Sequence, residues 1–114
     1  RGQLANSEGE LVGRPVSRGV VEGRARVAFS VSEAAALQPG EILVAPITDV
    51  GWTPYFSLIS GLITDVGSAV SHGAVIAREY GLPAIVNTRL GTKHIRTGDR
   101  VRLDAETGVV TVLS

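Results

Sequence analysis

The chain has 114 residues, of which 44% are hydrophobic and 19% charged, a composition that fits one compact domain rather than a disordered segment. Eleven Lys and Arg balance eleven Asp and Glu, so we expect neither nucleic acid nor an anionic membrane as a partner, because both are held by excess positive charge. The chain has no cysteine, which excludes disulfides and thiolate metal ligands.

The N-terminal part of the sequence predicts a tail, a strand and a short helix. Residues 1–10 are polar and aperiodic, which is typical of a linker or disordered terminus, and the domain itself is assigned to residues 11–114. Residues 19–29 alternate small or apolar side chains with charged ones, the period of a strand with one wet face. Ser32 then predicts the N-cap of a short helix that ends before Pro39.

The middle of the sequence predicts a buried strand and a second helix. Residues 41–45 form a short apolar run between helix breakers, which indicates a strand buried on both faces. Thr53 and Pro54 repeat the pattern of an N-cap and a first helical turn, which predicts a helix that Gly61 closes. The next strand is expected at residues 62–63.

The third helix is the most clearly bounded element. A loop of small residues spans 65–71, and residues 72–80 follow with a helical pattern. Ser71 predicts the N-cap of this helix, while Gly81 stands just past its end with Pro83 beyond it.

The C-terminal part is predicted to be β-rich. Residues 84–87 indicate another strand, and residues 100–105 and 108–113 alternate on either side of a turn at Glu106, which predicts a closing hairpin. A β-α-β-α-β centre between β-rich ends indicates an α/β domain with a mixed sheet and helices packed on it.

The turn into the third helix carries the strongest indication of chemistry. A helix N-terminus after a strand leaves backbone N–H groups without partners and adds the partial positive charge of the helix dipole, so such a turn binds anions. Small side chains would let a phosphate approach the main chain closely. The residues of this kind are Gly67, Ser68, Ala69, Ser71 and Gly73.

His72 opens the third helix, which places its imidazole over the expected anion site. Partial positive charge there favours an uncharged, nucleophilic ring and also favours a dianionic phosphoryl group on that ring. Arg78, almost two turns further on, is a candidate to contact a phosphate or a docking partner. Spacing alone leaves a second reading open, since a lone histidine at a helix start is more often a capping or surface residue.

A longer stretch of sequence favours the first reading. Residues 62–86 resemble the histidine-bearing signature of the mobile, or swivelling, phosphohistidine domain of the phosphoenolpyruvate-utilising enzymes. Residues 40–44 and 49–56 also resemble that family, so the likeness runs from about residue 11 to the end. The matching signature positions are Thr64-Asp65, Gly67, Ser71-His72, Gly73-Ala74, Val75-Ile76, Ala77-Arg78-Glu79, Tyr80 and Gly81-Leu82-Pro83-Ala84.

The resemblance implies a swivelling β/β/α fold and a phosphoryl shuttle. In that family an ATP-binding domain of the same chain phosphorylates the histidine, and the domain then swings to an acceptor-substrate domain and passes the group to pyruvate or another small acceptor. For this sequence the resemblance implies that His72 is catalytic and that Thr64 and Arg78 support it with the small residues of the loop. ATP and Mg²⁺ would bind elsewhere in the parent enzyme; we expect no cofactor or metal in this domain, and no turnover by it alone.

Two positions depart from the family pattern. The family often has a second Gly where Ser68 stands and often has Thr where Val70 stands. Val70 offers no hydroxyl for the regulatory phosphorylation of some dikinases, which favours the phosphoenolpyruvate synthase-like and rifampicin phosphotransferase-like members. Our interpretation is a carrier that relays phosphate from ATP to pyruvate. The alternatives are a carrier in a rifampicin-type antibiotic phosphotransferase and a non-catalytic swivelling binding module.

Other conspicuous residues receive structural interpretations. Asp49 and Asp65 are expected to cap turns at strand ends rather than bind Mg²⁺, which needs more converging oxygens. Trp52 is expected to pack at the entry of the second helix. The basic cluster after residue 87 is interpreted as a solvated loop; it comprises Arg89, Lys93, His94 and Arg96.

Two expectations concern the context of the domain. No apolar run approaches the roughly 18 residues that span a bilayer, and the N-terminus lacks the order of a signal peptide, so we expect a cytoplasmic protein without membrane contact. The chain has no methionine, so we expect a fragment or processed piece of a larger multidomain phosphotransferase.

Overall fold

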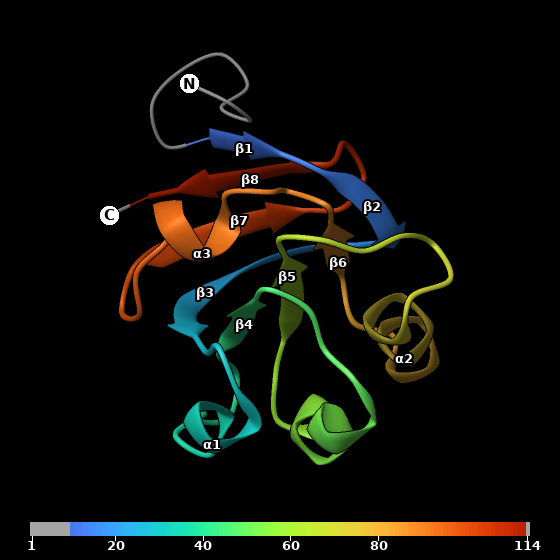
Figure 1. The fold of residues 1–114 in the computed structure, drawn as a ribbon. Helices are drawn as coiled ribbons and strands as arrows, with labels where there is room; N and C mark the ends of the chain where they lie inside the picture. The colour runs from blue at the N-terminus through green and yellow to red at the C-terminus, as the bar shows by residue number, and fades with distance from the viewer. Residues whose placement is uncertain (1–9, 114) are drawn as a thin grey trace.

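The computed structural model describes residues 10–113 and contains a mixed sheet covered by short helices (Figure 1). The strand order is β1-β8-β7-β3-β4-β5-β6-β2. The strands are β1 (Glu10–Val12), β2 (Arg14–Ser17), β3 (Val20–Val27), β4 (Ile42–Ala45), β5 (Gly61–Thr64), β6 (Ala84–Val86), β7 (Arg100–Asp104) and β8 (Val109–Val112). The helices are α1 (Val31–Ala34), the 3₁₀ helix η1 (Val50–Ser57), α2 (His72–Tyr80) and α3 (Gly91–His94). The predicted α/β class is confirmed.

Strand β3 joins an antiparallel half of the sheet to a parallel half. Its first part, Val20 to Arg24, pairs antiparallel with β7, and its last part, Ala25 to Val27, pairs parallel with β4. The predicted alternation holds: Gly23 and Ala25 are buried, whereas Glu22 and Arg24 are exposed. Strands β4, β5 and β6 continue the parallel half, so their carboxyl ends lie at the same edge of the sheet.

The central strand β4 is buried on both faces, as its continuous apolar run predicts. Ile42 and Val44 belong to a core cluster that they share with the antiparallel half and with Ile95. Leu43 and Ala45 belong to a second cluster, which includes residues of α1, η1 and α2. Figure 1 shows α1, α2 and the green 3₁₀ helix on one side and the antiparallel half with α3 on the other.

The start of α1 differs from the prediction. Ser30, not Ser32, is the N-cap: its hydroxyl accepts a hydrogen bond from the N–H of Glu33. The Glu33 carboxylate in turn accepts from the N–H of Phe29. This reciprocal arrangement resembles a capping box, which satisfies two N–H groups and fixes the start two residues earlier.

The predicted second helix is also corrected. It is a 3₁₀ helix that begins after Asp49, whose carboxylate accepts from the N–H of Gly51, so Thr53 is not its N-cap and Pro54 lies inside it. Gly61 does not close this helix but begins β5. A Cβ on Gly61 would lie 3.0 Å from Val21 Cγ1 and 3.1 Å from Leu103 Cδ1, so this position serves close packing.

The sheet has two short edge strands that the sequence did not reveal, β1 and β2. β1 pairs with β8 and β2 with β6. Strand β1 includes Glu10, so residue 10 belongs to the sheet and not to the predicted N-terminal tail. Residues 1–9 lie outside the described residues. The predicted hairpin of β7 and β8 is confirmed, with Leu103 opposite Val110. No helix of the described range is long and apolar enough to cross a membrane.

Candidate functional site

The helix that begins with His72 has the bounds predicted for it, Ser71 being its N-cap position. It ends where Gly81 adopts a left-handed conformation with φ of 70°, which ordinary side chains resist. The His72 side chain is partly exposed, so a second molecule or domain can reach it.

Two threonines hold the His72 ring. Thr48 Oγ1 lies 3.1 Å from Nδ1, and Thr53 Oγ1 lies 3.1 Å from Nε2. Phe56 packs edge-on against the ring, with the centroids 5.9 Å apart and the planes at 88°. A neutral imidazole has one N–H donor and one acceptor nitrogen, and a hydroxyl can match either. The two hydroxyls therefore orient the ring, and no charged side chain of the described residues is hydrogen-bonded to it.

The threonines come from separate parts of the chain. Thr48 follows β4 and Thr53 lies in η1, 24 and 19 residues before the histidine. Sequence reasoning missed both, because their hydroxyls meet the ring only through the parallel pairing of β4 and β5. The available signal was their place after the carboxyl end of a parallel strand, where α/β folds gather functional groups.

Gly73 makes room for this arrangement. It is buried, and a Cβ there would lie 2.9 Å from Thr48 Oγ1 and 3.0 Å from Leu62 Cδ2. The missing side chain therefore lets Thr48 approach the helix, a role that differs from the open phosphate access that the sequence suggested.

The loop before His72 is braced by its own serines. Ser71 Oγ donates to the carbonyl oxygen of Ser68 at 2.8 Å and does not cap the helix. Ser68 Oγ accepts from the N–H of Val70. Gly67 has φ of 147°, which disfavours any other residue.

Backbone donors remain open at the helix start. Within the described range, the N–H groups of His72 and Gly73 have no hydrogen-bond acceptor, as is usual for a first helical turn. Together with the helix dipole, they provide partial positive charge beside the imidazole.

Arg78 anchors the loop through main-chain contacts. Its guanidinium donates to the carbonyl oxygens of Val16 at 3.1 Å and Ala69 at 2.6 Å. It thus ties α2 to β2 and to the segment that precedes His72. A direct contact with phosphate stays a prediction.

Thr64 and Asp65 brace the far side of the same loop. Thr64 is buried, and its hydroxyl donates to the carbonyl oxygen of Val66 at 2.8 Å. Asp65 accepts from both the N–H and the hydroxyl of Thr92, while Asp49 caps η1. Asp49 thus caps the turn that follows it, as expected, whereas Asp65 contacts α3 instead of its own strand-end turn. Residues 10–113 contain no cluster of three or more potential metal-ligating side chains.

The other candidates lie outside the His72 contacts. Trp52 is 4% exposed and packs in the core. The basic cluster is not all loop, because Lys93 and His94 belong to α3, although Arg89, Lys93 and Arg96 are exposed as expected.

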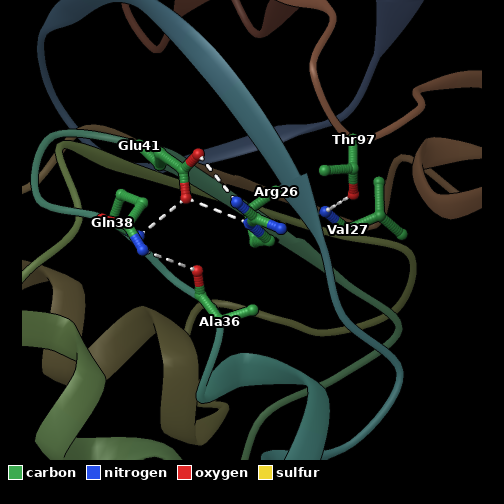
Figure 2. A network of polar contacts seen from close by, with 6 residues as sticks. All are labelled: Arg26, Val27, Ala36, Gln38, Glu41 and Thr97. Atoms are coloured by element: carbon green, nitrogen blue, oxygen red, sulfur yellow. Dashed lines mark hydrogen bonds and ion pairs between the residues drawn. The ribbon is translucent and has the colours of Figure 1, made fainter.

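A buried ion pair lies at the opposite, amino end of β4 (Figure 2). Arg26 donates to both carboxylate oxygens of Glu41, at 3.1 and 3.2 Å, and the N–H of Gln38 donates at 2.8 Å. Burial alone would raise the pKa of Glu41, but these hydrogen bonds and the charges of Arg26 and Arg24 together lower that pKa below its ordinary value.

Fold and site together define a mixed α/β domain that presents a hydroxyl-held histidine at a helix start. The chain belongs to the family of PEP-utilising enzyme mobile domains, whose model matches residues 37–108. The predicted family is thereby confirmed.

Relatives within larger proteins give the same picture. The chain is 55% identical over 103 residues to the rifampicin phosphotransferase of Bacillus cereus, which covers 90% of this chain and 12% of that protein. It is 43% identical over 106 residues to the phosphoenolpyruvate synthase of Aeropyrum pernix, with 90% and 13% covered. An Enzyme I solution structure matches with a TM-score of 0.62 at 29% identity, over 70% of this chain and 33% of that chain. The chain thus spans only about an eighth of these two curated relatives.

Proposed function

We propose that this domain carries a phosphoryl group on His72 between two sites of a larger phosphotransferase. The observation that supports this most is the partly exposed ring held by Thr48 and Thr53 beside unpaired N–H groups. A neutral imidazole is a nucleophile, and the helix start favours the dianion that it acquires. One location therefore suits both the free and the phosphorylated state.

We assign the attack to Nε2. Thr48, which contacts Nδ1, is 4% exposed and packs under the ring, so no phosphoryl group can enter there without moving the core. Thr53, which contacts Nε2, is only partly buried on η1. In this arrangement Nδ1 carries the proton and donates to Thr48, which leaves the lone pair of Nε2 on the accessible side.

The transfer then needs no proton removal from the ring. The Nε2 lone pair forms the N–P bond while the P–O bond to the departing part of the nucleotide breaks. The proton stays on Nδ1 and continues to donate a hydrogen bond to Thr48 Oγ1. This oxygen stabilises the positive charge that the ring gains. In the second transfer, an acceptor oxygen forms a new P–O bond while the N–P bond breaks, and the bonding pair returns to Nε2 and restores the neutral ring.

The parent enzyme would supply the other parts of the reaction. In our proposal a separate ATP-binding domain with Mg²⁺ phosphorylates His72 in the cytoplasm, and an acceptor-substrate domain receives the group. Pyruvate remains one acceptor class, as in a phosphoenolpyruvate synthase. The higher identity to rifampicin phosphotransferase, 55% against 43%, favours an antibiotic-type acceptor.

The direct test uses the full-length parent with ATP labelled in its transferable phosphates and Mg²⁺. Phosphate that is acid-labile and base-stable should appear on this domain and should be absent from His72→Ala. His94→Ala is the matched control, because that histidine has no such threonine pair within the described residues and should leave labelling unchanged. Label that persists in His72→Ala contradicts the proposal.

Discharge of the labelled parent separates the acceptor classes. Addition of pyruvate should leave the label in place, and addition of a rifamycin should remove it, if the parent is of the antibiotic type. Rapid discharge by pyruvate would assign a phosphoenolpyruvate synthase-like parent instead.

A further inference from the structure

Large exposed hydrophobic side chains are concentrated at one edge of the domain. Of eleven such side chains among the described residues, six follow the carboxyl ends of β3, β4 and β5. Two of them are almost fully exposed, Val50 at 79% and Val70 at 83%. We call this set the apolar rim; its members are Phe29, Val31, Ile47, Val50, Val66 and Val70.

Backbone contacts show that the three rim segments are neighbours. The N–H of Ala28 donates to the carbonyl oxygen of Val44, which joins the ends of β3 and β4. The N–H of Val66 donates to the carbonyl oxygen of Pro46, which joins the loops after β4 and β5.

The rim adjoins the His72 ring. Thr48 lies between Ile47 and Asp49 in the loop after β4, and it contacts Nδ1. Thr53, three residues after Val50, contacts Nε2, and Val70 stands two residues before the histidine. Rim residues are therefore close in sequence to both threonines that contact the ring and to the first residue of α2.

The rim carries no positive charge of its own. The segments 28–31, 46–51 and 65–71 contain no Lys or Arg, and their charged residues are Asp49 and Asp65. A phosphoryl group on His72 brings roughly two more negative charges. A cation does lie beside these segments, because the Arg78 guanidinium of α2 donates to the carbonyl oxygen of Ala69. A partner that covers this surface during transfer must therefore match apolar side chains and add positive charge to that of Arg78.

We propose that the apolar rim is the docking surface for the phosphoryl-donor domain of the parent chain. This inference rests on the proposed function, because the donor must cover His72 to transfer a phosphoryl group to it. The chain spans only 12% of the rifampicin phosphotransferase that it resembles, so most of such a parent lies outside this domain. Contact is made by apolar burial, whereas the cations that the phosphate needs beyond Arg78 belong to the donor.

The test is single-turnover labelling of His72 in the full-length parent by labelled ATP with Mg²⁺. The variant Phe29→Ser/Val50→Ser removes two exposed rim side chains, 59% and 79% exposed, that contact neither ring nitrogen. We expect His72 of this variant to be labelled at least about tenfold more slowly than in wild type. We also expect the labelling rate of the wild type to change little with added salt. Val20→Ser/Leu113→Ser is the matched control outside the rim and should label at the wild-type rate.

The outcomes separate this inference from the proposed function. Wild-type labelling of His72 with an equal rate in the rim variant overturns the docking inference and leaves the carrier function standing. Normal labelling of the variant with slow discharge to the acceptor assigns the rim to the acceptor domain and overturns it as well. A labelling defect of the rim variant that becomes larger when the parent is diluted indicates contact with a second copy of the chain. That result also contradicts the docking inference. Absence of label from wild-type His72 rejects the carrier function itself.

Discussion

The two ends of β4 have opposite characters. At the amino end, the Glu41 carboxylate is 5% exposed and is bonded to Arg26 and Gln38, so it is almost closed to solvent. At the carboxyl end, hydroxyls rather than charges hold the His72 ring, N–H groups are open, and apolar side chains face outward. The amino end is complete within the domain, whereas in our proposal the carboxyl end is completed by a partner domain.

This difference explains how one short strand serves both stability and function. A buried charge is tolerated at the amino end because its partners are permanent. A permanent charged partner at His72 would compete with the phosphoryl group, whereas a hydroxyl can exchange roles as the ring changes state. Changes at the amino end should therefore alter stability alone, and changes at the carboxyl end should also alter transfer.

The largest loss of stability is expected for Glu41→Gln. This change leaves Arg26 without its charge partner in a largely buried place and should lower the free energy of unfolding by about 2–3 kcal/mol. Glu22→Gln is the matched control at the exposed pair with Arg102, where about 0–1 kcal/mol is expected. Urea denaturation of the two variants measures the difference; equal losses would contradict the contrast between a buried and an exposed pair.

The same carboxylate should make stability depend on pH. The pKa of Glu41 is lower in the folded protein than its ordinary value of 4.5. Its contribution is therefore fully present above 4.5 and is lost as the pH falls through the folded value. Denaturation at a series of pH values should show a smaller acid-induced loss in Glu41→Gln than in wild type. Parallel curves for the two proteins would show that this group does not contribute.

Gly73→Ala should affect both stability and transfer. The added Cβ meets Thr48 Oγ1 and the buried side chain of Leu62, so overpacking should cost about 1–2 kcal/mol after the helix-favouring effect of alanine. Displacement of Thr48 should also slow phosphorylation of His72. Gly81→Ala is the matched control. It loses stability because residue 81 has a left-handed backbone conformation, whereas its added Cβ has no atom within 4 Å. Labelling at the wild-type rate in Gly73→Ala would contradict the role given to Thr48.

The smallest change in stability is expected for the two threonines. Thr48→Val leaves Nδ1 unpaired in the interior and should cost about 1 kcal/mol, whereas Thr53→Val, at a partly exposed site, should cost a few tenths. Labelling should slow by about tenfold in Thr48→Val and less in Thr53→Val, because the first loses the contact that fixes the tautomer. If Thr53→Val slowed labelling more than Thr48→Val, Nδ1 would be the attacking nitrogen and Nε2 the protonated one.

Local signals in the sequence predicted much of this molecule. The alternation of β3, the apolar run of β4 and the Ser71 and Gly81 boundaries of α2 are set by neighbours in the chain, and the structure confirms them. His72 and its loop followed from the same signals and from the family likeness. The edge strands β1 and β2 are too short to show a period, and they form by pairing with distant strands.

The predictions were wrong or incomplete where several residues could cap the same helix, and where residues far apart in the sequence are in contact. Ser30, Ser32, Asp49 and Thr53 can all cap a helix, and tertiary packing decides among them. The contacts of Thr48 and Thr53 with His72 depend on the pairing of β4 with β5. The interior role of Gly73 depends on Leu62 and Thr48, which no local pattern brings together.

The most direct test of the central claim is to locate the phosphate by atom. The full-length parent is phosphorylated with ATP and Mg²⁺, digested under alkaline conditions, and the peptide that contains His72 is examined by phosphorus–nitrogen NMR correlation. We predict that the phosphorus is bonded to Nε2 of His72. Phosphorus on Nδ1, or on any other residue, would contradict it.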